Sequence, residues 1–325
     1  GDSQAGSEWC CDKDGRARAR RRSPPQARAV SGAAAPHRGT IFLEQADVIG
    51  HEAYPDEQYV LRLRAPKCAA AATPGSFIHL HCGPGVPMRR PLSIMRASAA
   101  EGWIEVLYKI VGRGLGELAL RKPGEALSCL GPIGRGFAAH AERPRTLMIG
   151  GGVGIPPLVF LAETLAAESG SRWRPLVLMG SELPFPFRTE TSRIAVTGMP
   201  PGATAGMPLM DSCGVPSRLA SLAGFPGCHA GLVTDLAHIW LASLAPAELA
   251  EVEMFACGPE AMLRAVAALA RRHARPCQVS LEENMACAVG GCAGCTVLVQ
   301  TPDGPAMKRI CVDGPVFDAA TVFTS

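Results

Sequence analysis

Twelve residues near the middle of the chain read Thr146-Leu147-Met148-Ile149-Gly150-Gly151-Gly152-Val153-Gly154-Ile155-Pro156-Pro157. A short apolar run leads into a glycine turn, and Leu158, Leu161 and Leu165 then recur at helical spacing. Strand, glycine turn and helix in this order are typical of the edge where an open α/β sheet binds dinucleotide phosphates. The turn is not G-x-G-x-x-G, so a purely structural connection is an alternative. The predicted nucleotide contacts are Gly150, Gly151, Gly152, Gly154 and Pro156.

The pattern of alternating strands and helices continues beyond this turn. Apolar runs at 175–179, 231–234 and 252–256 are predicted strands, and a helical pattern at 261–272 follows the last of them. Strands that alternate with helices indicate a parallel α/β domain, which we place at residues 141–273. The Pro- and Gly-rich segment 181–229 has no assignment.

The segment before the glycine turn predicts a different architecture. Residues 59–64, 77–81 and 103–109 alternate apolar and polar side chains, as half-buried strands do. Turn sequences such as Lys122-Pro123-Gly124 separate these runs. Short strands at this spacing predict a small antiparallel β-barrel over residues 40–140, which residues 131–137 would close.

Two elements of the predicted barrel are suited to a flavin. Arg89-Arg90-Pro91-Leu92-Ser93 opens a strand, and a guanidinium there can bind a diphosphate bidentately. A surface arginine before a turn is the alternative. The strand that begins at Leu107 ends in glycines up to Leu115, whose N–H groups could bind a phosphate.

A second part of the dinucleotide site is predicted after the last α/β strand, in Ala256-Cys257-Gly258-Pro259-Glu260. Small residues at this point would let a nicotinamide ring approach the flavin. We therefore assign Cys257, Gly258 and Pro259 to the nicotinamide site. A buried packing thiol is the alternative for Cys257.

The most specific pattern is Cys287-Ala288-Val289-Gly290-Gly291-Cys292-Ala293-Gly294-Cys295, followed by Cys311. The spacing C-x4-C-x2-C…C is that of plant-type [2Fe-2S] ligands. Gly290, Gly291 and Gly294 would let the loop wrap closely, since glycine tolerates φ > 0 and has no Cβ. Structural zinc, or no metal, are the alternatives, although zinc sites usually pair two short cysteine elements. We expect a [2Fe-2S] unit at residues 274–325 with ligands Cys287, Cys292, Cys295 and Cys311.

Charge is concentrated at the N-terminus. The first 40 residues hold eight Lys and Arg against four Asp and Glu, which leaves 24 basic and 25 acidic residues of the chain's 32 and 29. The body therefore has no nucleic-acid footprint. Residues 1–39 are expected to be a disordered basic tail; a nucleic-acid contact, a membrane contact or a targeting function is the alternative. No apolar stretch is long enough to span a membrane, and we expect a cytoplasmic protein.

The order of these motifs resembles that of the ferredoxin–NADP reductase superfamily. The stretch Ser280–Cys295, together with Cys311–Phe317, is similar to the electron-transfer subunits of NAD-dependent dihydroorotate dehydrogenases. The resemblance covers residues 40–325. It implies FAD in the barrel, NAD(H) as a diffusible co-substrate of the α/β domain, and a [2Fe-2S] cluster between FAD and a partner. The FAD contacts that it implies are Arg90, Pro91, Leu92, Ser93, Leu107, Tyr108, Lys109, Gly114 and Leu115.

The resemblance also implies a hetero-oligomer in pyrimidine biosynthesis, in which an FMN-containing partner oxidises dihydroorotate. This chain would pass electrons, and none of its residues is expected to do substrate chemistry. Leu115 stands where the family usually has Thr or Ser, and segment 181–229 is longer than the family's connection. Glu182 is the one clear acid near the end of the second α/β strand, so the choice between NAD and NADP stays open. The alternatives are a paralogous NAD(P)H-dependent reductase subunit serving a hydrogenase, transhydrogenase or oxygenase, and a zinc-stabilised binding module.

Overall fold

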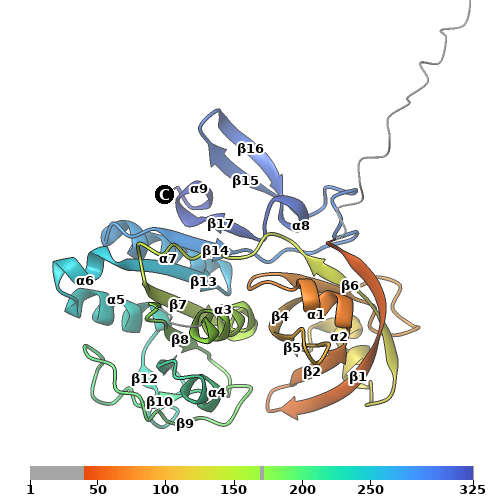
Figure 1. Cartoon of the computed structure of the whole chain (residues 1–325), viewed down its shortest axis with the longest axis horizontal. Helices are drawn as coiled ribbons and strands as arrows, with labels where there is room; N and C mark the ends of the chain where they lie inside the picture. The colour runs from red at the N-terminus through yellow and green to blue at the C-terminus, as the bar shows by residue number, and fades with distance from the viewer. Residues whose placement is uncertain (1–39, 169–171, 325) are drawn as a thin grey trace, which may run out of the picture. The chain divides into compact units, whose positions relative to one another are not determined.

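The computed structural model of the chain describes residues 40–168 and 172–324 (Figure 1). The expected basic tail at residues 1–39 lies outside the described residues. No helix within the described ranges is long and apolar enough to cross a membrane.

Six antiparallel strands close into a barrel in the order β1-β2-β5-β4-β3-β6 (Figure 1). Alternate side chains point inward, and Leu61, Ile78 and Ile94 are completely buried there. The antiparallel barrel predicted from the sequence is confirmed. The elements are β1 Phe42–Tyr54, β2 Gln58–Arg64, α1 Pro66–Ala71, β3 Phe77–Leu80, β4 Arg90–Ser98, β5 Trp103–Lys109, α2 Gly112–Ala119 and β6 Ala126–Ile133.

A seven-stranded sheet follows, in the order β12-β11-β8-β7-β13-β14-β17. All its neighbouring strands are parallel except β17, which runs antiparallel to β14. The parallel α/β domain is thus confirmed. Its strands are β7 Arg145–Gly151, β8 Leu176–Gly180, β11 Ser217–Ser221, β12 His229–Ala230, β13 Val252–Cys257, β14 Cys277–Ser280 and β17 Val316–Asp318. The other elements are the 3-10 turn η1 Gly152–Gly154, α3 Pro156–Ala167, β9 Glu190–Thr191, β10 Ala205–Gly206, α4 Pro208–Ser212, α5 Val233–Ser243, α6 Pro246–Ala250 and α7 Glu260–Arg272.

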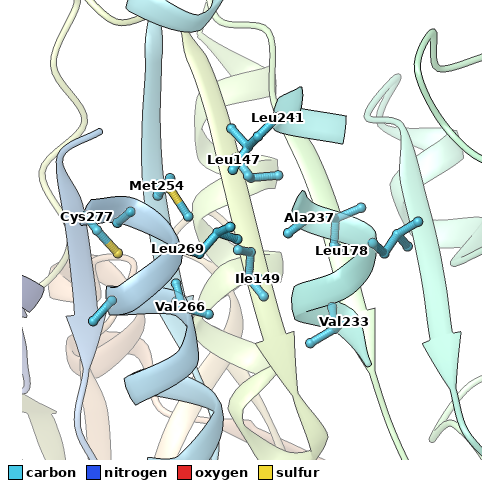
Figure 2. Packing of buried hydrophobic residues seen from close by; sticks show 14 of the residues in the cluster. Leu147, Ile149, Leu178, Val233, Ala237, Leu241, Met254, Val266, Leu269 and Cys277 are labelled. Carbon is cyan, nitrogen blue, oxygen red and sulfur yellow. The ribbon is translucent and has the colours of Figure 1, made fainter. Parts of the chain in front are cut away.

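Helices cover both faces of this sheet. Figure 2 shows α5 and α7 packed on one face, where Ala237 and Val266 approach Leu147 and Ile149 of β7. The alternate residue of β7, Met148, points to the other face and packs with Leu158 of α3. Side chains that point to either face of the sheet are buried. The strands are therefore continuous apolar runs, as is typical of parallel strands covered by helices on both faces.

One predicted strand is wrong, and several strands were not predicted. Residues 231–234 do not form a strand, because Val233 begins α5 and the side chain of Asp235 accepts a hydrogen bond from Leu232 N at 3.1 Å. The longest of those in the unassigned segment is β11. Its polar residues Ser217 and Arg218 hide it, yet both are buried, at 0% and 6% exposure.

The C-terminal part adds β14 and β17 to the sheet and forms a further small unit. This unit contains the cysteine loop and, after it in the chain, a two-stranded hairpin (Figure 1). Cys295 and Cys311 are buried in one apolar cluster with Phe77 of the barrel. The remaining elements are β15 Thr296–Thr301, β16 Gly304–Arg309, α8 Ile310–Asp313 and α9 Ala319–Val322.

Candidate functional site

A cavity of about 480 Å³ opens beside β4 and β5. The barrel contributes one wall, and the other comes from Val153, Pro315 and the segment Ser280–Met285. Eight of the nine implied FAD contacts line this cavity: Arg90, Pro91, Leu92, Ser93, Leu107, Tyr108, Lys109 and Leu115. Tertiary structure has thus brought together two sequence elements that lie apart in the chain.

The ninth residue, Gly114, lies against the guanidinium of Arg90, a cation that lines the cavity. A Cβ built on Gly114 would lie 2.6 Å from Nε and 2.7 Å from Nη2 of Arg90. Arg90 Nη1 donates to the carbonyl oxygens of Met88 (2.9 Å) and Arg89 (3.1 Å), which orients the guanidinium. Arg89 itself is committed to the barrel, since its guanidinium donates to the carbonyl and hydroxyl of Ser128.

Tyr108 lines the cavity, but its side chain belongs to the barrel core. The residue is 1% exposed, its hydroxyl pairs with His51 Nε2 at 2.8 Å, and its ring stacks on Tyr59. Burial raises the pKa of this hydroxyl, so it stays protonated. Arg90 and Lys109 are therefore the positive groups that the barrel presents to the cavity.

The segment before the cysteine loop was not assigned to the flavin by sequence reasoning. Glu282, Asn284 and Met285 line the cavity, and the sequence marked them only as part of the stretch Ser280–Cys295 that carries the family resemblance. The protein around Glu282 raises the pKa of its carboxyl by desolvation, although part of the residue is exposed to solvent.

A second cavity, of about 560 Å³, lies at the carboxyl ends of β7, β8 and β11. Gly151, Gly152 and Pro259 line it, as expected for the dinucleotide site. The sequence did not identify the part formed by Gly180–Leu183, Ala220–Leu222 and Gly231–Thr234, because that required the position of β11. Glu182 is the one charged residue among those that line this cavity.

The other residues predicted to contact the nucleotide pack inside the glycine turn. Gly150, Gly154 and Pro156 are buried and do not line this second cavity. A Cβ on Gly154 would overlap the backbone of Cys257 and Gly258, so the two predicted nicotinamide motifs are in direct contact. Cys257 is completely buried, and burial holds the pKa of its thiol well above the usual range. Its thiol therefore packs in the interior of the α/β domain, and the assignment of Cys257 to the nicotinamide site stays a prediction.

The four C-terminal cysteines lie on one loop and one short helix. Cys295 Sγ and Cys311 Sγ are 3.4 Å apart. Backbone N–H groups point at the other two thiols, from Cys292 N to Cys287 Sγ and from Gly294 N to Cys292 Sγ, each at 3.4 Å. Burial acts to raise the pKa of Cys287, but N–H groups of the loop lower it, to about 6 overall.

The residues of the cysteine loop with a left-handed φ are only in part the ones expected. Of the three glycines singled out, Gly290 has a left-handed φ of 83°, whereas the other left-handed positions are Ala288 and Ala293, at 56° and 54°. A Cβ on Gly290 would lie 2.6 Å from Val312 Cγ2, so close packing also requires glycine there. Two alanines held in this region cost conformational energy, which the surrounding loop must offset.

Comparison with known proteins decides the family. A family model for the iron-sulfur cluster binding domain of dihydroorotate dehydrogenase B matches residues 282–323. The dihydroorotate dehydrogenase B (NAD(+)) electron transfer subunit of Geobacillus kaustophilus (strain HTA426) is 33% identical over 287 residues, 87% of this chain and 99% of that protein. The same subunit of Desulforamulus reducens (strain ATCC BAA-1160 / DSM 100696 / MI-1) is 31% identical over 262 residues, 80% of this chain and 90% of that protein.

The chain belongs to the family of dihydroorotate dehydrogenase B electron transfer subunits. Solved structures share the fold. An NADH-dependent reduced ferredoxin-NADP oxidoreductase, solved for insight into flavin-based electron bifurcation, has a TM-score of 0.67 at 24% identity, covering 86% of this chain and 90% of that chain. The ferredoxin reductase of carbazole 1,9a-dioxygenase has a TM-score of 0.52 at 23% identity, covering 72% and 65%. The resemblance drawn from the sequence and the electron-transfer role that it implies are confirmed.

The donor set of this electron transfer subunit fits a [2Fe-2S] cluster. Four thiols with N–H donors beside two of them match the needs of two irons bridged by electron-rich sulfides. Over residues 40–168 and 172–324, no three His, Cys, Asp or Glu side chains converge as a site for one metal ion. The first cavity likewise fits a flavin diphosphate, since Arg90 and Lys109 supply positive charge.

Proposed function

We propose that this chain carries electrons between NAD(H) and a partner subunit that oxidises dihydroorotate, through FAD and a [2Fe-2S] cluster that it binds itself. The family membership supports this role, and the cavity beside β4 and β5 supports the route. One observation carries it: the same cavity is lined by the Arg90–Ser93 motif and by the segment that leads into the cysteine loop.

The residues of the barrel would hold the FAD. Arg90 and Lys109 offset the diphosphate charge, and the N-terminal turn of α2 offers N–H groups to a phosphate. Pro91, Leu92, Ser93, Leu107 and Leu115 form the wall against which the flavin ring packs. Leu115 has no hydroxyl to donate, so the N–H groups of the turn and the guanidinium of Arg90 would make most of the hydrogen bonds to the phosphate.

The α/β domain would bind NAD(H) at the carboxyl edge of its sheet. Gly151 and Gly152 precede α3, whose N-terminus favours the pyrophosphate, and Pro259 borders the same cavity. Gly150, Gly154, Pro156, Cys257 and Gly258 keep the turn close to the end of β13. Bound flavin exchanges hydride with nicotinamide and single electrons with an iron–sulfur cluster; the protein supplies position and electrostatics.

Cys287, Cys292, Cys295 and Cys311 would ligate the cluster, and a partner with FMN would receive or deliver its electrons in a hetero-oligomer. The compartment is proposed to be the cytoplasm, because all eleven cysteines of the described residues are free thiols, as suits a reducing environment.

Reconstitution tests this function. The loaded chain is mixed with the catalytic subunit of a dihydroorotate dehydrogenase B, and NADH formation from dihydroorotate is followed by absorbance. We expect a stable complex whose NADH formation requires both subunits, and about two irons and two labile sulfides per chain. Stoichiometric zinc without iron in anaerobic preparations, or no electron transfer in the mixture, would contradict the proposal.

A further inference from the structure

His79 occupies the seam between the barrel and the cysteine-bearing unit. It lies on β3, between Ile78 and Leu80, whose side chains point into the barrel core. Side chains alternate along a strand, so His79 shares the outer face with Phe77. Phe77 packs in the cluster that contains Cys295 and Cys311, and that cluster therefore covers this face of β3.

The imidazole of His79 is buried without a partner. The residue is 1% exposed, and neither Nδ1 nor Nε2 makes a hydrogen bond. The amide of Gln58, buried at 3% exposure, shows the usual arrangement, because it donates to the carbonyls of Pro55 and Pro184. An unsatisfied buried polar group costs about 1–3 kcal/mol, so such an exception requires an explanation.

The ring lies close to backbone of the segment that leads into the cysteine loop. The ring of His79 faces the backbone of Met285 and of Arg89, without the geometry of a full hydrogen bond to either. Burial, with Arg89 and Arg90 nearby, lowers the pKa of His79. The neutral ring keeps one N–H to donate.

Met285 is placed where such a bond would matter. It lines the same cavity as Arg90 and Pro91, and it stands two residues before Cys287. The partner of His79 in the β3–β4 ladder is Pro91, a residue of that cavity. A bond from the ring to Met285 would therefore tie the cavity wall to the start of the cysteine loop.

We infer that His79 is a positioning residue: a small shift of the segment Leu281–Met285 brings the backbone carbonyl of Met285 within reach of the ring N–H, and this bond holds the segment on the barrel and sets the separation of the flavin and cluster sites. The inference rests on the proposed function. Electron transfer weakens steeply with distance, so loosening this segment slows the step between the two cofactors and leaves hydride transfer from NADH untouched.

Three variants of the full chain, loaded with FAD and cluster, test the role. His79→Phe keeps a ring without a donor, His79→Gln keeps a donor, and His81→Phe is the matched control two residues along. We expect His79→Phe to slow cluster reduction after NADH addition on the order of fivefold, the value of one net hydrogen bond. It should also alter the electron paramagnetic resonance signal of the reduced cluster. His79→Gln and His81→Phe should keep both near wild type.

A second measurement does not depend on redox activity. Hydrogen exchange of the amides in residues 281–287 should be faster in His79→Phe than in wild type and restored in His79→Gln. Equal exchange and equal rates in wild type and His79→Phe would overturn the inference, and so would equal losses in His79→Phe and His79→Gln. Failure of wild-type NADH to reduce the flavin would instead refute the proposed function, and the exchange data would still decide the role of His79.

Discussion

The guanidinium of Arg90 rests on Gly114, where a β-carbon would lie 2.6 Å from its Nε. Gly114→Ala should therefore displace Arg90 from the cavity and weaken FAD binding by about tenfold or more, because a charge-assisted hydrogen bond is worth about 1.5–3 kcal/mol. Titration of the cofactor-free chain with FAD, followed by flavin fluorescence, measures the loss. Gly116→Ala is the control. It lies on the same helix, the Cβ that it adds would meet no neighbouring atom within 4 Å, and it should bind FAD normally. Equal affinities of the two variants would show that Arg90 does not hold the diphosphate.

Glu182 should set the preference for NAD(H). It is the one charged residue lining the cavity at the ends of β7, β8 and β11, and a carboxylate accepts from a ribose hydroxyl but repels a 2′-phosphate. Glu182→Arg should raise the NADPH to NADH ratio of kcat/KM for flavin reduction by about tenfold or more, since arginine binds phosphate bidentately. Glu190→Arg, in the same segment but outside that cavity, should leave the ratio unchanged. An unaltered ratio in Glu182→Arg would place the adenosine ribose elsewhere.

Cys292→Ser should separate the two redox steps. Cys292 is exposed in the middle of the loop and receives an N–H from Gly294, so serine removes a ligand without disturbing the core. Stopped-flow bleaching of the flavin by NADH should persist, whereas delivery of electrons to the partner should disappear. Cys228→Ser, a half-buried cysteine outside the loop, should preserve both. A folded, iron-free Cys292→Ser chain that still reduced the partner at the normal rate would make the cluster structural.

His79 should make the chain sensitive to acid. Burial and the nearby arginines lower its pKa from 6.5, so below that pH the unfolded chain binds more protons than the folded chain. Stability therefore falls as pH falls through this window, by up to about 1.4 kcal/mol per pH unit. His79→Phe should flatten the decline between about pH 6.5 and 5.5 in urea unfolding experiments, and His81→Phe should not. Parallel pH profiles for wild type and His79→Phe would mean that His79 ionises freely in the folded protein.

Local chemistry explains what could be predicted. Cys287, Cys292 and Cys295 lie within nine residues, and a loop of that length must bring its own thiols together. The glycine turn after β7 is equally local, because strand, turn and helix are contiguous. For the same reason the residue pattern of β5 predicted its place in the barrel without knowledge of its neighbours.

Sequence patterns did not predict the structure correctly at two places in the α/β domain. The segment 231–234 resembles a strand by composition, yet Val233, Leu236 and Trp240 recur at helical spacing, and α5 buries them. Strand β11 carries Ser217 and Arg218, whose polarity indicates a loop until the sheet around them is known. Arg218 is accommodated by donating to the carbonyls of Ser217 and Ile194, partners that composition does not reveal.

The sequence by itself indicated the family, the barrel and the parallel α/β domain, and it predicted the cluster cysteines, because each of these depends on short stretches whose pattern or spacing constrains the backbone directly. Tertiary structure alone decided that Gly114 supports Arg90, that Leu281–Met285 walls the flavin cavity and that His79 is buried without a partner. These relationships join residues from about two dozen to more than 200 positions apart. Such contacts form only when packing of the whole chain outweighs the entropy of closing long loops, and no local pattern records which contacts result.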